Sequence, residues 1–209
     1  MVLCLVIGDS HIPFRKKEIS EIISNELDEL ITEKLFDYTF FTGDIIKAPN
    51  FIQFLNRRTE KNLFTVVGNM DYYYGNRNAP KYQELKILLD NKKKLCFGLT
   101  HGAQIQPRGD RSQLERLAIE KAINILISGH THKEDVYLTK RGILLINPGS
   151  VTGAWSFIAS GIPTFSVIRI KKQSSDIQVS LYQLNIKNNE ISKLDSYFIF
   201  ENNKIQYKY

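Results

Sequence analysis

Residues 1–13, MVLCLVIGDSHIP, carry the pattern from which the fold can be predicted. Val2–Ile7 is an apolar run of strand length, and it leads directly into Gly8, Asp9 and His11. In open α/β sheets, ligands bind beyond the carboxyl ends of the strands, where a glycine lets the backbone approach a ligand closely. A buried strand that ends in metal-binding side chains therefore predicts an α/β fold with a ligand site at one edge of a sheet.

Four further apolar runs along the chain end in the same kind of motif. Each is followed by a glycine and a side chain that can bind a metal: 38–42 by Gly43 and Asp44, 63–67 by Gly68 and Asn69, 95–100 by His101 and Gly102, and 125–127 by Gly129, His130 and His132. Residues i and i+2 of an extended segment face the same way. Asp9 with His11, and His130 with His132, are therefore each expected to direct two ligands to one point.

The histidines point to a metal site. The chain has four, and all of them lie in these motifs: His11, His101, His130 and His132. Imidazole together with carboxylate suits manganese, zinc or iron, and the two oxygens of Asp44 allow it to bridge two ions. Two such ions about 3.5–4 Å apart can hold a phosphate group and activate water. The sequence therefore predicts a cofactor of two divalent metal ions.

The spacing of apolar residues predicts an α/β sandwich of two sheets with helices on the outside. The predicted helices are 18–36, 51–58 and 112–122, the last with Ser112 as its N-cap and Glu115 at capping-box spacing. The predicted strands are 2–7, 38–42, 63–67, 95–100, 125–127, 135–138, 142–146, 164–170, 177–184 and a weaker one at 197–200. Residues 72–80 are predicted to form a loop. No linker or repeat divides the chain, so residues 1–209 are predicted to form a single domain.

The composition is that of a soluble globular protein. Of the 209 residues, 43% are hydrophobic and 24% are charged, and no apolar run approaches the roughly 20 residues of a membrane-spanning helix. The net charge of +6 comes from small basic clusters separated by acidic stretches, whereas nucleic-acid-binding proteins usually concentrate their charge on one face. Cys4 and Cys96 lie in apolar runs and are predicted to be reduced core thiols. We expect a cytoplasmic protein without a nucleic-acid partner.

The motifs GDSHIP, TGD, GNMD, THG and SGHTH follow one another in the order typical of calcineurin-like metallophosphoesterases, and the chain resembles that family. The resemblance implies a two-sheet α/β sandwich, in agreement with the pattern of apolar residues. It also implies which residues hold each ion. One metal would be held by Asp9, His11, Asp44 and His132. The other would be held by Asp44, Asn69, His101 and His130.

The resemblance is closer to one branch of the family. The segments HGAQIQPRGD, ILISGHTHK, INPGSVTGAW and IPTFSVIRI resemble the vacuolar protein sorting 29 family, the small metallophosphoesterase-fold subunit of the retromer complex. The resemblance extends over residues 1–185. Residues 72–94 are expected to form a longer loop than is usual in the family, and the C-terminal tail diverges from it. Resemblance to this branch implies a role in protein sorting at endosomes. The chain would be peripheral to the endosomal membrane and would reach it only through the complex. An α-solenoid subunit would cover the metal-side edge, and regulatory proteins would bind an apolar patch at Ile105, Tyr182 and Leu184.

The catalytic histidine of the family, which follows the asparagine of GN, is replaced here by Met70. A thioether has no proton to donate, and general acid–base assistance is typically worth about 10²–10⁴-fold in rate. We therefore expect no catalytic residue and a non-catalytic scaffold. Two alternatives remain open. The first is an active metal-dependent phosphodiesterase or phosphatase, because all seven ligand positions are filled, and the second is a nuclease or nucleic-acid-binding protein.

Overall fold

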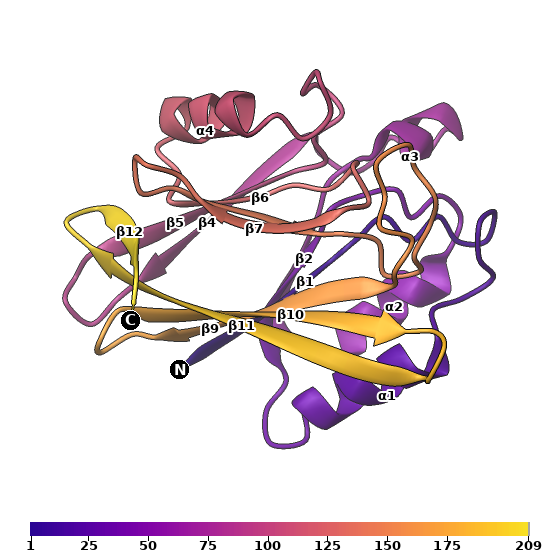
Figure 1. Cartoon of the computed structure of the whole chain (residues 1–209), viewed down its shortest axis with the longest axis horizontal. Coiled ribbons are helices and arrows are strands. Elements are labelled where there is room, and N and C mark those ends of the chain that lie inside the picture. Colours follow the sequence, from indigo (N-terminus) through magenta and orange to yellow (C-terminus); the bar gives the residue numbers. More distant parts are fainter. Residues whose placement is uncertain (209) are drawn as a thin grey trace.

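The computed structural model of the chain, which describes residues 1–208, is a sandwich of two β-sheets (Figure 1). Its strands are β1 (Val2–Ile7), β2 (Phe36–Phe41), β3 (Thr59–Thr65), β4 (Tyr82–Leu88), β5 (Lys94–Thr100), β6 (Ile125–Ile127), β7 (Glu134–Leu138), β8 (Leu144–Pro148), β9 (Thr164–Lys171), β10 (Asp176–Asn185), β11 (Glu190–Glu201) and β12 (Lys204–Tyr207). Its helices are α1 (Glu21–Leu30), α2 (Pro49–Arg57), α3 (Asn69–Tyr73) and α4 (Arg111–Glu120). The seven-stranded sheet has the order β12-β11-β10-β9-β1-β2-β3, and the five-stranded sheet has the order β4-β5-β6-β8-β7. The predicted α/β sandwich is confirmed.

Parallel pairing brings the predicted ligand motifs to one edge of the sandwich. Strands β1, β2 and β3 pair in parallel in one sheet, and β5, β6 and β8 do so in the other. Ile7 pairs with Phe41, and Leu99 pairs with Ile127. Within each sheet, the loops that follow these paired strands therefore begin at similar positions along the strand direction. The carboxyl ends of five strands from two sheets therefore surround one region.

Apolar side chains fill the space between the sheets and under the helices. Phe40 of β2 stacks on Phe64 of β3 and on Phe97 of β5, with ring centroids 5.4 Å apart in both pairs. A second core lies between the seven-stranded sheet and helices α1 and α2, and a third lies between the five-stranded sheet and α4 (Figure 1). Cys4 is buried in the central core and Cys96 is half-buried, and both thiols are free.

The three predicted helices begin or end elsewhere than predicted, and α2 runs over Pro49–Arg57 instead of 51–58. Helix α1 ends at Leu30, because the N–H of Ile31 turns back to the carbonyl of Asp28 and closes the last turn. The apolar spacing that continues to residue 36 therefore belongs to a loop and to β2. Helix α4 is capped by Asp110, whose carboxylate accepts the N–H of Gln113. The predicted N-cap, Ser112, lies inside the first turn.

The structure contains two strands that the sequence pattern does not predict. Strand β4 lies at the edge of its sheet inside the segment expected to be a long loop, and of its residues only Ile87 is fully buried. Strand β12 follows a turn in which Asn202 and Asn203 both have positive φ. The N–H of Ile205 in β12 donates to the carbonyl of Gly142, 2.8 Å away in the other sheet's β7–β8 turn. None of the helices within residues 1–208 has the length and apolar character needed to cross a membrane.

Candidate metal centre

Five loops from the two sheets place the predicted ligands around one small cavity. The side chains come from the ends of β1 (Asp9, His11), β2 (Asp44), β5 (His101) and β6 (His130, His132), and from the start of α3 after β3 (Asn69). All of them except Asn69 are buried, with exposed fractions of 6% or less. Buried carboxylates and imidazoles in such number require partners, because burial of an unpaired charge is unfavourable.

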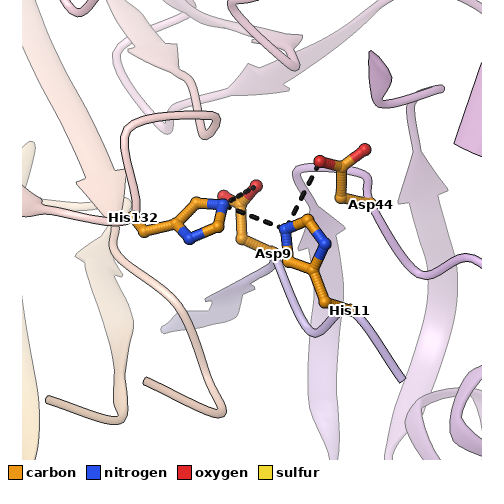
Figure 2. A group of neighbouring side chains, drawn as sticks. All are labelled: Asp9, His11, Asp44 and His132. Carbon is orange, nitrogen blue, oxygen red and sulfur yellow. Dashed lines mark hydrogen bonds and ion pairs between the residues drawn. The ribbon is translucent and has the colours of Figure 1, made fainter. Parts of the chain in front are cut away.

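The first group of ligands has converged on a single point (Figure 2). Ligand atoms of Asp9, His11, Asp44 and His132 all lie within 4.8 Å of one another. The Nε2 atoms of His11 and His132 are 2.9 Å apart. His11 Nε2 is 3.4 Å from Asp44 Oδ2, and His132 Nε2 is 3.6 Å from Asp9 Oδ1. This is the set that the family resemblance assigns to one metal.

The second group lies on the other side of Asp44. His101 Nε2 is 3.0 Å from Asn69 Oδ1 and 3.6 Å from Asp44 Oδ2. The His130 ring packs edge-on against His101, with centroids 5.1 Å apart. The same Asp44 oxygen therefore faces His11 of the first group and His101 of the second, which is the position of a bridging carboxylate.

Hydrogen bonds behind two imidazoles direct their lone pairs toward the cavity. Nδ1 of His101 lies 2.8 Å from the Thr42 carbonyl, and Nδ1 of His132 lies 2.8 Å from the Ala154 carbonyl. A carbonyl only accepts, so Nδ1 carries the proton in each ring and Nε2 presents a lone pair. These lone pairs face carboxylate oxygens, which are also acceptors. A divalent cation fits such a set of donor atoms, because it binds both kinds of atom at once.

The backbone at the ligands is strained. Five of the predicted ligands, none of them glycine, have positive φ: Asp9 (48°), His11 (49°), Asp44 (58°), His130 (70°) and His132 (59°). Such conformations cost roughly 1–3 kcal/mol each and persist where the surroundings over-determine them, often at functional sites. Because the backbone at these residues is not extended, residues i and i+2 need not face the same way. His130 and His132 do not meet at one point: His132 belongs to the first ligand group, and His130 packs against His101 in the second.

Two glycines permit the close approach of the ligand loops. A Cβ on Gly68 would lie 1.9 Å from Asp44 Oδ1, and a Cβ on Gly129 would lie 2.5 Å from Asp9 Oδ2. Real Cβ atoms do not come this near to carboxylate oxygens. The glycines of the motifs therefore leave space for the carboxylates rather than for a ligand.

A buried carboxylate behind the ligands holds the Asp44 loop. Asp71 accepts the N–H groups of Asp44 (2.7 Å), Ile46 (2.6 Å) and Gly68 (2.9 Å). The Ser150 hydroxyl donates to the carbonyl of Asp9 at 2.7 Å. Sequence analysis identifies neither Ser150 nor the carbonyls of Thr42 and Ala154 as parts of the site. The signals for them were the motif TGD, which begins at Thr42, and the segment INPGSVTGAW, which contains Ser150 and Ala154.

Burial shifts the protonation of the ligands in opposite directions. It lowers the pKa of His11 to about 2, of His130 to about 3 and of His132 to about 4. Burial also raises the pKa of Asp9, with the nearby Asp44 carboxylate adding to the effect, and it raises the pKa of Asp44. The three imidazoles are therefore neutral at pH 7, as metal ligands must be. A cation among them would offset the unfavourable burial of the two carboxylates.

Comparison with known proteins agrees with this geometry. The sequence profile of the calcineurin-like phosphoesterase superfamily domain matches residues 2–173, which is most of the chain. The chain belongs to the calcineurin-like phosphoesterase superfamily.

The chain is similar to a protein named as a probable metallophosphoesterase and to proteins named as Vacuolar Protein Sorting 29. A probable metallophosphoesterase of Methanothermobacter thermautotrophicus is 31% identical over 174 residues, which cover 83% of this chain and 89% of the relative. The structure of Vacuolar Protein Sorting 29 from Cryptosporidium parvum matches with a TM-score of 0.80 and 28% identity, over 95% of this chain and 98% of the other. Vps29 of Entamoeba histolytica in complex with Zn²⁺ matches with a TM-score of 0.77 and 27% identity, over 93% and 99% of the chains.

Met70 differs from the superfamily pattern at the centre itself. Its N–H donates to Asp44 Oδ1 at 2.8 Å, and it lines a cavity of about 110 Å³ together with Arg15, Arg108 and five of the metal-ligand candidates. The two guanidinium groups can attract an anion to this cavity. A thioether beside them cannot protonate a leaving group.

The residues predicted to form a partner-binding patch are not at the surface. Ile105, Tyr182 and Leu184 have exposed fractions of 5%, 3% and 5%. Ile105 packs in the core beneath α4, and Tyr182 stacks on Phe165 with centroids 4.7 Å apart. Their role in partner binding stays a prediction, and in this conformation their side chains are not accessible to a partner.

Proposed function

We propose that the chain is a retromer-type subunit that acts as a scaffold in endosomal protein sorting rather than as an enzyme. The observation that carries the proposal is the match to Cryptosporidium Vacuolar Protein Sorting 29, which extends over 95% of this chain and thus well beyond the metal motifs. A Vps29-like fold supports a retromer-type role. On this proposal the protein works in the cytoplasm and reaches endosomal membranes through its complex.

The chemistry of the cavity supports a non-catalytic role. Protonation of the leaving group assists the cleavage of a phosphate ester, and Met70 stands where the superfamily usually has the histidine. The other residues around the cavity are ligand candidates, Arg15 and Arg108, and the segment Trp155, Ser156 and Phe157. The Ser156 hydroxyl donates to the Thr131 carbonyl at 2.5 Å. The site is therefore suited to hold metal ions and an anion without rapid turnover.

An exposed aromatic rim beside the cavity supports partner binding on the metal side. Trp155 and Phe157 are 64% and 82% exposed, and their rings meet edge to face at 5.0 Å. Phe14 stacks on Tyr74 at 4.6 Å, and both rings reach the surface. Arg15 donates to the Trp155 carbonyl and thus joins the two loops. We call the four aromatic residues the aromatic rim. Tryptophan, tyrosine and arginine carry much of the energy at protein interfaces.

The proposal is tested by the affinity of the chain for an α-solenoid fragment of the retromer backbone. We expect the two proteins to bind, and Trp155→Ala and Phe157→Ala each to weaken binding by about tenfold or more. Leu194→Ala is the matched control, because Leu194 is also 64% exposed but lies in β11. Absence of binding by the wild-type chain, or equal losses in the rim and control variants, would contradict the proposal.

An active metal-dependent phosphodiesterase is the second candidate function. Its support is the completeness of the ligand set, since all the predicted positions meet around Asp44. Manganese, zinc or iron at this centre would supply Lewis-acid chemistry, and the chain would hold the substrate anion. Hydrolysis of bis-p-nitrophenyl phosphate with added manganese tests it. Turnover that His101→Ala abolishes would establish an enzyme and exclude a pure scaffold.

A further inference from the structure

A second and larger cavity adjoins the metal centre. This cleft has a volume of about 570 Å³, and Asn69, Tyr72, Tyr82, His101, Leu117 and Lys121 are among the residues that line it. It lies beside α3, β4 and α4. Small-molecule sites typically occupy about 300–1,000 Å³ and combine apolar walls with a few polar groups. The cleft has the size and composition of a binding site for an organic molecule.

The walls of the cleft combine aromatic rings with positive charge. Lys121 Nζ lies 5.4 Å from the centroid of the Tyr82 ring. Arg77 does not line the cleft, but its guanidinium lies 4.2 Å from the centroid of the Tyr72 ring, which does. Lys81 adds a further positive charge, and none of the described residues that line the cleft is acidic. Leu117 of α4 contributes an apolar surface. This combination favours a ligand that is both aromatic and anionic.

One end of the cleft is made by residues of the second ligand group. Asn69 lines both the cleft and the small cavity at the metal centre. His101 also borders the cleft, with its Nε2 3.0 Å from Asn69 Oδ1. A molecule whose anionic group lies at the metal centre can therefore place the rest of its atoms in the adjoining cleft.

We propose that the cleft binds the aromatic group of a phosphate ester whose phosphate lies at the metal centre. The aromatic group packs between the tyrosines and Leu117, while Lys81 and Lys121 neutralise the remaining negative charge. The proposal concerns binding and needs no turnover, so it is compatible with Met70. It does not rest on the retromer role, because the aromatic rim and the cleft involve different residues.

Calorimetric titration of the manganese-loaded protein with AMP and with ribose 5-phosphate separates the two parts of the site. Both probes carry the same sugar and phosphate, and only AMP has an aromatic base. Stacking on aromatic side chains contributes enough that we expect AMP to bind about tenfold tighter or more. Equal affinities, or no binding of either probe, would overturn the proposal.

Variants in the wall of the cleft provide the second arm of the test. Ala103 is half-buried and lines the cleft, so Ala103→Trp is expected to fill it and to remove the preference for AMP while ribose 5-phosphate still binds. Ala159→Trp is the control, because Ala159 is also half-buried but lies outside the cleft. A preference for AMP that survives Ala103→Trp would contradict the assignment.

A charge reversal tests the same cleft without changing its volume much. Lys121→Glu is expected to weaken AMP binding several-fold, because it places a negative charge beside the Tyr82 ring. Lys140→Glu is the matched control, since Lys140 lies in the β7–β8 turn, outside the cleft, and β7 is at the opposite edge of the sheet from β4. Equal effects of the two reversals would mean that AMP responds only to net charge and that the cleft is not its site.

Discussion

The metal-side edge and the C-terminal strands of this chain are built in different ways. At the metal-side edge, buried polar side chains sit on strained backbone and are held by hydrogen bonds to backbone carbonyls and from backbone N–H groups. Strands β10 and β11 pair in regular antiparallel register over ten residue pairs. Most side chains of β10 are buried or half-buried, and most of those of β11 are exposed or half-buried. The edge depends on the identity of single residues, whereas the strands depend mainly on periodicity. Substitutions should therefore have large effects at the edge and small effects at exposed positions of the strands, such as Leu194.

The largest effect on folding is expected from Gly68→Ala. Its new Cβ would lie 1.9 Å from Asp44 Oδ1, and overpacking of a tight site costs about 3 kcal/mol of unfolding free energy. Gly161→Ala is the comparison, because Gly161 has positive φ but a Cβ added there would meet no atom within 4 Å. That variant should cost only about 1 kcal/mol, from backbone strain. Urea denaturation of both variants measures the difference, and equal costs would show that the space beside Asp44 is not critical.

The next effect concerns metal binding. Asp44→Ala removes the one oxygen that faces both ligand groups, at 3.4 Å from His11 and 3.6 Å from His101. We expect the affinity for zinc or manganese to fall by about 100-fold or more, which corresponds to about 2.7 kcal/mol. Calorimetric titration with each metal measures it. Asp176→Ala, in β10, is the control and should bind metal like the wild type; retention of affinity in Asp44→Ala would refute the bridging position.

Another buried carboxylate, Asp37 of β2, sharpens the comparison, because its environment is the reverse of that of Asp9 and Asp44. Burial alone would raise the pKa of Asp37, but hydrogen bonds from Lys34 (2.7 Å) and Lys61 (2.8 Å) hold it below its usual value. A lowered pKa in the folded state stabilises the fold above the unfolded pKa of about 4, and this contribution is lost as the pH falls through the folded value.

Asp37→Asn is therefore expected to lower the unfolding free energy at pH 7 by about 2 kcal/mol. The difference from the wild type should shrink as the pH is lowered below about 4, where the wild-type carboxylate also becomes protonated. Thermal melts over a series of pH values would show this convergence. A difference that stays constant with pH would mean that the charge of Asp37 does not matter.

The smallest effect is expected in β11. Leu194 is 64% exposed, and surface substitutions of this kind usually change stability by less than about 0.5 kcal/mol. Leu194→Ala should accordingly leave both the melting temperature and the metal affinity close to those of the wild type. A marked loss of stability would show that the strand is specified by more than its periodicity.

The sequence allowed prediction of the fold class and of which loops meet, because strand ends in a parallel sheet share an edge. It did not reveal β4, since an edge strand with one fully buried residue, Ile87, lacks a clear apolar pattern. Nor did it reveal the left-handed backbone of His130 and His132, which depends on tertiary contacts. The surface role expected for Tyr182 differs from its buried position against Phe165, because strand periodicity does not tell which face of a sheet is covered.

The hydrogen bond from Ile205 to Gly142 has a practical consequence. It fastens the last strand to the end of the sandwich away from α3, and Figure 1 shows the labels of both chain termini at that end. An affinity tag or a surface attachment at either terminus would therefore lie away from α3, whose Asn69 and Tyr72 line the cleft. Immobilised protein should remain open to an incoming α-solenoid or small molecule, and biosensor measurements can use either orientation.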